Sequence, residues 1–192
     1  MPVAFPQLFK TQYDWDFATE PEQALGRRRI YLPRGRTLGG SSSLNAMMYI
    51  RGNPVDFDGW ADGEGAPGWS YREMLPYFIK AECNERGDPR YHGFSGPLSV
   101  QDSRSMHPLV DRLIEAAVQS GHRPNDDFNG AEQLGVGRYQ VTQRNGVRCS
   151  AAAAYLNPSL DRPNLRVFTD TLVLRLLFEG RRAIGVSVHR YG

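Results

Sequence analysis

The spacing of apolar residues along the chain predicts four helices. The clearest pattern covers residues 106–120, where apolar side chains recur every three or four positions and form one stripe. Pro108 stands near the start of this pattern and Gly121 just past its end, as is typical of helix boundaries. We expect the stripe to pack in the core and not to bind a ligand. Shorter patterns predict helices at residues 41–50, 54–62 and 71–81.

Alternating and continuous apolar runs predict strands, chiefly in the second half of the chain. The strands expected from these runs are residues 98–100, 136–142, 164–169, 171–178 and 183–188. The last two pair as a hairpin through a turn at 179–182. Residues 82–96, which are polar and rich in glycine, are expected to form a loop, and 149–156 a short helix capped by Ser150. Aromatic residues alternate with aspartates at 13–17, which suits a short edge strand.

The composition is that of an ordinary globular protein. The 192 residues are 40% hydrophobic and 23% charged, and the net charge is only +2. Such a balanced charge gives no case for nucleic acid as a partner. No apolar run approaches the roughly 20 residues that a membrane-spanning helix needs, and the first residues show no signal-peptide pattern. We therefore expect no transmembrane segment.

Neither the cysteines nor the acidic residues form a metal-binding pattern. Cys83 and Cys149 are far apart in the sequence and fit reduced thiols, so we expect a cytoplasmic protein. The turn-rich stretch 122–135 contains several acidic residues, but they lack the spacing and the final glutamate of an EF-hand. We therefore expect no bound metal ion.

Residues 35–52, GRTLGGSSSLNAMMYIRG, carry the strongest chemical signal in the chain. Gly39 and Gly40 run into three serines, and the predicted helix 41–50 follows. Paired glycines let the backbone approach a ligand closely, and the N–H groups at a helix start favour anionic groups such as phosphates. Local chemistry thus allows two interpretations, a cofactor cradle or a Gly/Ser loop before an ordinary helix.

Five arginines crowd the stretch before this motif. Arg27, Arg28 and Arg29 are expected to form a solvated basic loop. Arg34 and Arg36 border the motif, and for them two interpretations stay open, contact with a pyrophosphate or simple solvation.

A series of short motifs runs from this stretch almost to the end of the chain. P-R-G-R-x-L-G-G-S-S-S-x-N-A-M-x-Y-x-R-G is followed by D-F-D-G-W-A, G-W-S-Y and L-P-Y-F. The segments concerned are Pro33–Gly52, Asp56–Ala61, Gly68–Tyr71, Leu75–Phe78, Asp127–Leu156 and Asn164–Val188. In type and order they resemble the glucose–methanol–choline (GMC) family of flavin oxidoreductases. Because the resemblance covers nearly the whole chain, it is specific.

This resemblance implies an α+β fold, derived from an α/β architecture, with parts of two domains. Residues 1–64, which hold the glycine–serine motif, and 149–192 would belong to the FAD-binding domain, and residues 65–148 mainly to the substrate domain. Members of the family begin with a strand, a G-x-G-x-x-G turn and a helix that bind the dinucleotide, and this unit is expected to be lacking here. They end with a segment carrying a catalytic histidine, and none of the four histidines falls in it. We therefore expect an internal fragment of a longer flavoenzyme.

The resemblance also implies which residues bind FAD. The backbone of the glycine bend would lie against the cofactor, Asn45 and the residues after it would follow the flavin ring, and the backbone of Val173 would reach the adenine. Asn45 and Val173 also have structural interpretations, a helix-packing hydrogen bond and a core strand position. Some relatives carry, at the position of Leu44, a histidine that bonds covalently to the flavin; leucine cannot, so non-covalent FAD is expected. The expected cofactor-binding residues are Thr37, Gly39, Gly40, Ser41, Asn45, Ala46, Met47, Met48 and Val173.

The implied activity is oxidation of the CH–OH group of a small-molecule alcohol, with hydride passing from the substrate carbon to the flavin. The electron acceptor, oxygen or a quinone-like carrier, is left open. The family's base is the C-terminal histidine, so we expect no catalytic residue among these 192 and no turnover by this chain alone. The alternative is a non-catalytic truncated product or a pseudo-enzyme of the same family. Lyase chemistry also occurs on this scaffold, but nothing in these residues points to it.

Overall fold

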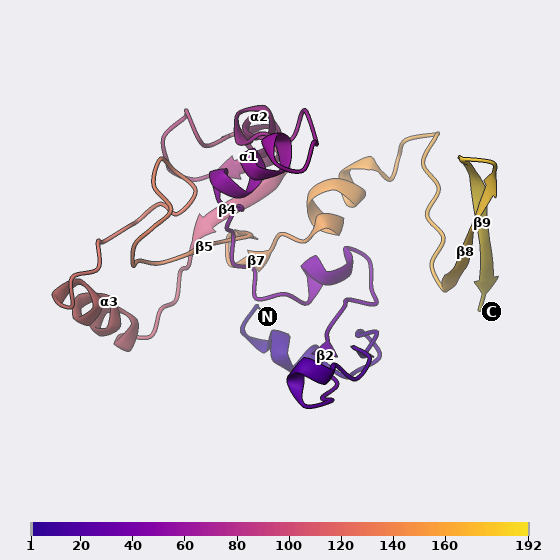
Figure 1. Ribbon diagram of the computed structural model, residues 1–192, viewed down its shortest axis with the longest axis horizontal. Helices are drawn as coiled ribbons and strands as arrows, with labels where there is room; N and C mark the ends of the chain where they lie inside the picture. Colours follow the sequence, from indigo (N-terminus) through magenta and orange to yellow (C-terminus); the bar gives the residue numbers. More distant parts are fainter. Residues whose placement is uncertain (1, 192) are drawn as a thin grey trace. The chain divides into compact units, whose positions relative to one another are not determined.

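The computed structural model describes residues 2–191 and contains both helices and sheets (Figure 1). The chain divides into two compact units, Met1–Pro158 and Ser159–Gly192. The helical segments are η1 Pro2–Leu8, η2 Gln23–Leu25, η3 Gly40–Ser43, α1 Pro54–Asp62, α2 Tyr71–Ala81, α3 Leu109–Gln119, η4 Ala152–Leu156 and η5 Asn157–Ser159. The strands are β1 Phe17–Ala18, β2 Tyr31–Leu32, β3 Glu82–Asn84, β4 Leu98–Asp102, β5 Gln140–Val141, β6 Gln143–Arg144, β7 Val147–Arg148, β8 Thr171–Glu179 and β9 Arg182–Arg190. No helix within residues 2–191 has the length and apolar character that crossing a bilayer requires.

A three-stranded sheet forms the centre of the first unit. Its order is β3-β4-β5, with β3 parallel and β5 antiparallel to β4. Val100 on β4 is completely buried. The extended chain after the glycine motif joins this sheet, because Tyr49 N donates to Gln140 O and Thr142 N donates to Met47 O, both at 2.9 Å. The sheet therefore fixes the segment that leaves the motif.

Helices α1 and α2 form as the sequence predicts, with the predicted bounds. The Asn53 side chain caps α1 by accepting from Val55 N at 3.0 Å. At the start of α2, Ser70 and Glu73 form a reciprocal capping box. The Phe57 ring of α1 meets the Phe78 ring of α2 edge-on, with centroids 5.7 Å apart, so aromatic packing joins the two helices.

The segment between α1 and α2 contains the letters G-x-G-x-x-G, at Gly63–Gly68. Both Gly65 and Gly68 have positive φ, 65° and 90°, so they serve as turn residues. A dinucleotide fingerprint follows a strand and opens a helix. This segment follows a helix instead, and it therefore lacks the structural context of that fingerprint.

The helix predicted at 106–120 is confirmed over Leu109–Gln119, but its apolar stripe does not pack in a core. Leu109 and Leu113 are 67% and 69% exposed, and no residue of α3 is buried against the described part of the chain. The expectation of core packing is thus wrong for residues 2–191. Amphipathic spacing predicts a helix but does not say which partner covers its apolar face.

The helix predicted at 41–50 is wrong. Only the short 3₁₀ turn η3 forms, and the Asn45 side chain then accepts a hydrogen bond from Met47 N at 3.0 Å. Met47 takes a positive φ of 63°, which ends any helical path. Two factors outweigh the helical apolar pattern: the local side-chain bond of Asn45 and the pairing of the next residues with the central sheet.

The smaller strand predictions are confirmed in part. The strand at 98–100 is present and extends to Asp102, whereas only Gln140–Val141 forms within 136–142. Gly137 approaches the Asn125 carbonyl so closely that a Cβ would clash, so this stretch packs against a turn instead of continuing a strand. The loop expected at 82–96 begins instead with β3. The short helix near 149–156 is confirmed in π form, with Ser150 Oγ accepting from Ala153 N at 3.3 Å.

The second unit is built on the β8–β9 hairpin, which confirms the strands and the turn predicted there. Gly180 in the turn has a positive φ of 57°, a conformation that favours glycine. The strand predicted at 164–169 is wrong, since these residues have no regular secondary structure. At the start of the chain the edge strand predicted at 13–17 is largely irregular, and only Phe17–Ala18 pairs with β2.

Candidate cofactor-binding site

The two glycines of the bend play different structural roles. Gly39 has φ 86°, and a Cβ there would lie 2.6 Å from Ser43 Oγ and 3.1 Å from Ala152 N. Gly39 therefore packs its bare backbone against the protein itself. Gly40 has φ 55°, and a Cβ there would meet no atom within 4 Å. Only Gly40 presents open space into which another molecule can approach the backbone.

The serines after the bend hold its shape instead of starting a long helix. Ser42 Oγ donates to Gly39 O and accepts from Ala151 N at 2.8 Å. Ser43 Oγ donates to Leu38 O at 2.8 Å. The expected helix N-terminus for anion binding is thus wrong, because η3 has four residues and no side-chain cap.

Asn45 lies exposed beside the bend, with its carboxamide oxygen engaged. Oδ1 accepts from Met47 N at 3.0 Å and from Arg148 Nη1 at 2.8 Å. Arg148 Nη1 also donates to Ser42 O at 3.1 Å, and partial burial lowers the pKa of this arginine. Sequence reasoning did not find Arg148, since nothing in the sequence pairs a residue of the 143–148 turn with Asn45.

The residues predicted along the flavin ring differ in their exposure to solvent. Leu44 and Met47 are buried, so their side chains belong to the core of the first unit. Met48 is 57% exposed, Ala46 is half-buried, and Thr37 and Ser41 are exposed. The structure therefore brings the predicted residues from Thr37 to Met48 together in one stretch and leaves part of it accessible. Their contact with a flavin stays a prediction.

Val173, the predicted adenine contact, lies in the second unit. It is part of β8, pairs with Val188 on β9, and is 55% exposed. It is therefore not a core strand valine within the described residues. Its role at the cofactor stays a prediction.

A buried ionic cluster that sequence reasoning missed stands next to this stretch. Arg51 Nη2 lies 2.6 Å from Glu82 Oε2, and Glu82 Oε1 lies 3.1 Å from His92 Nδ1. His92 Nε2 in turn lies 2.9 Å from Asp127 Oδ2. Burial alone would lower the pKa of His92, but hydrogen bonds to Asp127 and Glu82 raise it to about 9. The imidazole is therefore charged at neutral pH.

Backbone and amide contacts join this cluster to the exit of the motif. Asn129 Oδ1 accepts from Arg51 N at 2.8 Å, and its Nδ2 donates to Tyr49 O at 3.1 Å. Gln133 Nε2 donates to Arg51 O at 2.9 Å. These amide contacts and the Arg51–Glu82 ion pair therefore hold residues 49–51 in place at the exit of the motif.

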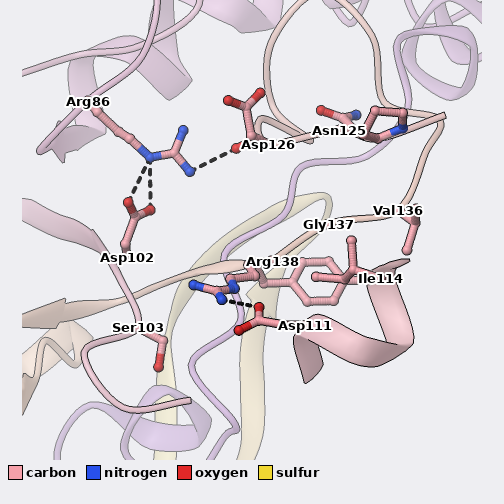
Figure 2. Close-up of a pocket in the computed structure, with 12 residues that line it drawn as sticks. Arg86, Asp102, Ser103, Asp111, Ile114, Asn125, Asp126, Val136, Gly137 and Arg138 are labelled. Atoms are coloured by element: carbon pink, nitrogen blue, oxygen red, sulfur yellow. Dashed lines mark hydrogen bonds and ion pairs between the residues drawn. The ribbon is translucent and has the colours of Figure 1, made fainter. Parts of the chain in front are cut away.

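A separate cavity of about 610 Å³ lies between α3 and the segment 124–139 (Figure 2). On one side Arg86 Nε reaches both oxygens of Asp102 at 2.9 Å, and on the other Arg138 pairs with Asp111. None of the predicted flavin residues lines it. Because its arginines are paired with carboxylates, this cavity offers no free cation for a cofactor phosphate.

The exposed stretch around Gly40 fits an aromatic cofactor rich in hydrogen-bond acceptors. The open face of Gly40 gives close access to the backbone, and Asn45 is exposed beside it with its oxygen already bonded. Arg148 adds a partly buried cation with no carboxylate partner among the described residues. These features match the needs of a flavin, a flat ring with carbonyl and nitrogen acceptors.

Comparison with known proteins gives a consistent result. A family model described as GMC oxidoreductase matches residues 19–192. Mouse mitochondrial choline dehydrogenase is 47% identical over 193 residues, which cover 100% of this chain and 32% of that protein. The oxygen-dependent choline dehydrogenase of Brucella ovis is 44% identical over 190 residues, with 98% and 34% covered. Among solved structures, pyridoxine 4-oxidase from Mesorbium loti has a TM-score of 0.90 at 36% identity and covers 98% of this chain and 38% of that one.

The chain thus spans about one third of the length of the curated relatives that it matches. The family match extends over nearly all of this chain, and the fold agrees with that of a solved oxidase. The glycine bend, Asn45 and the segment after it all lie inside the matched region. The chain belongs to the GMC oxidoreductase family, whose cofactor is FAD.

Proposed function

We propose that this chain is part of an FAD-dependent oxidoreductase that oxidises the CH–OH group of a small alcohol. The observation that carries the proposal is the open backbone face at Gly40, next to an exposed Asn45. The relatives named for choline and pyridoxine support a small polar alcohol as the substrate class. The electron acceptor is either oxygen, which the name of the Brucella relative supports, or a quinone-like carrier.

The residues of the motif would hold the cofactor without a covalent bond. The backbone from Thr37 to Ser41 would lie against it, Asn45, Ala46 and Met48 would face its ring, and Met47 would contribute its backbone. Leu44 is buried and has no nucleophilic atom, so it offers no point of covalent attachment. Bound FAD supplies the acceptor for the hydride that leaves the alcohol carbon.

The substrate domain, the adenine contact, the catalytic base and the cellular location are also proposals. Residues 65–148 would belong mainly to the substrate domain, and Val173 would contact the adenine through its backbone. The base that takes the hydroxyl proton would be a histidine contributed by polypeptide other than these 192 residues. We also propose a cytoplasmic location, because the two cysteines fit reduced thiols.

The direct test is binding of FAD by the chain, measured by calorimetry and by quenching of flavin fluorescence. The wild type is expected to bind FAD. Gly40→Ala should weaken binding at least roughly tenfold, since a Cβ would fill the open face. Gly26→Ala is the matched control, because Gly26 also has positive φ (64°) and no atom within 4 Å of a Cβ. Absence of binding, or equal binding by both variants, would overturn the proposal.

The second candidate, a non-catalytic product of the same family, also has an observation in its favour. The apolar stripe of α3 and several apolar residues of the β8–β9 hairpin, such as Phe178, are exposed. Such surfaces call for a covering partner and favour association over independent catalysis. A thermal melt of the isolated chain separates the two: a cooperative unfolding transition would argue for a self-sufficient part of the enzyme and against this candidate, and aggregation without such a transition would support it.

A further inference from the structure

We propose that Arg148 is a positioning residue for the flavin. It holds the Asn45 carboxamide with its oxygen turned toward the protein and its NH₂ group turned toward the open face, and it leaves a positive charge beside the cofactor. This inference rests on the proposed function, because it needs a flavin at that face.

The orientation of the Asn45 amide follows from its contacts. Both Arg148 Nη1, at 2.8 Å, and Met47 N, at 3.0 Å, are obligate donors. A flipped amide would set its own NH₂ group against both of them, so Oδ1 must face them and Nδ2 must face away. Nδ2 has no acceptor among the described residues. Asn45 is thus left with two N–H donors for an incoming acceptor.

The bond from Arg148 is not a by-product of local chain geometry. Arg148 is 103 positions away from Asn45 in the chain. It lies on β7 and pairs with Gln143 of β6. The same Nη1 also holds the Ser42 carbonyl at 3.1 Å. One guanidinium therefore ties the serine turn to Asn45, and any shift of the β6–β7 hairpin moves both.

The charge of Arg148 is unusual within this chain. The buried or cavity-lining arginines Arg51, Arg86 and Arg138 are each paired with a carboxylate. Arg148 is partly buried and touches only neutral oxygens, and this loss of hydration lowers its pKa. A partly buried cation that has no carboxylate partner can stabilise negative charge on a bound molecule.

This arrangement suits the two states of a flavin ring. The oxidised ring offers carbonyl and ring-nitrogen acceptors to the Asn45 donors, and reduction adds negative charge that a nearby cation stabilises. Arg148 should therefore favour both binding and reduction. Removal of its charge is expected to shift the flavin potential to more negative values.

The first arm of the test uses the chain without cofactor. The side-chain ¹⁵N–¹H resonances of Asn45 are compared in Arg148→Leu, Arg148→Lys and the control Arg144→Leu. Arg144 lies exposed on the neighbouring β6 and is not part of the site. Arg148→Leu should shift the Asn45 resonances, Arg148→Lys should shift them less, and Arg144→Leu should leave them unchanged. Unchanged resonances in Arg148→Leu would overturn the inference whether or not FAD binds.

The second arm uses FAD. Arg148→Leu should raise the dissociation constant about tenfold and make the potential more negative, and Arg148→Lys should recover most of both effects. In an Asn45→Ala background Arg148→Leu should matter less for binding, because the orienting bond is already lost and only the effect of the charge remains. Full additivity of the two changes would overturn the inference. If the wild type fails to bind FAD, the proposed function fails, and the resonance shifts alone decide whether Arg148 orients Asn45.

Discussion

Arg51 and Glu82 form an ion pair that is almost completely shielded from water. Arg51 Nη2 lies 2.6 Å from Glu82 Oε2, and the side chains are 3% and 0% exposed. The pair connects the segment that leaves the glycine motif to β3 of the central sheet. It therefore supports the site through the backbone without touching the bend itself.

Removal of one partner of this pair should be costly. In Glu82→Gln, Arg51 stays buried without a counter-charge, and the free energy of unfolding should fall by about 3–5 kcal/mol. Glu20→Gln is the control, because Glu20 pairs with Arg29 at 3.5 Å in solvent, where the loss should be about 0–1 kcal/mol. Urea unfolding measures both. Equal losses would contradict a dominant role for the buried pair.

His92 should make stability depend on pH above neutrality. Its folded pKa is raised from 6.5 to about 9, so its stabilisation is complete below pH 6.5 and is lost as pH rises through 9. Glu82 and Asp127 flank the ring, with Arg51 beyond Glu82 and Asp88 nearby. The stability difference between wild type and His92→Gln should shrink by roughly 3 kcal/mol between pH 6 and pH 10.

The control for this measurement is His122→Gln, since His122 is exposed just after α3. Its unfolding free energy should follow the wild-type pH profile. Parallel profiles for wild type and His92→Gln would show that His92 is not the titrating group.

Alanine substitutions at the two glycines of the bend should show which glycine is packed against the protein and which faces open space. Gly39→Ala combines positive-φ strain with close contacts to Ser43 and Ala152, and we expect a loss of about 2–3 kcal/mol. Gly40→Ala meets only the strain, so about 1 kcal/mol is expected. Thermal or urea unfolding without cofactor gives both values. A reversed order would contradict the assigned roles.

Ser42 should contribute to stability through two hydrogen bonds. Its Oγ donates to Gly39 O and accepts from Ala151 N, which ties the bend to the start of the 151–156 helical turn. Ser42→Ala leaves both groups without this partner, and a loss of about 1–2 kcal/mol is expected. Ser105→Ala on the exposed surface should change little by the same assay. A loss no larger than that of Ser105→Ala would show that solvent replaces the hydroxyl.

Local signals predicted some elements well. The apolar pattern placed helices α1 and α2 at their observed bounds, and the structure adds the Asn53 cap and the Ser70–Glu73 capping box at their starts. The helix predicted at 41–50 is wrong because the same apolar spacing also fits a segment that pairs with β5. The sequence also located the glycine bend, but not which glycine is packed and which is open.

The sequence by itself determined the family, the two capped helices, the terminal hairpin and the position of the motif, since these depend on neighbouring residues and on motif order. Only the tertiary structure decided that Arg148 meets Asn45 and that Arg51, Glu82, His92 and Asp127 form one buried cluster. Bonded partners in these groups are between 10 and 103 positions apart in the chain. Their charges and donors become partners only when the folded sheet excludes water and sets the distances between them.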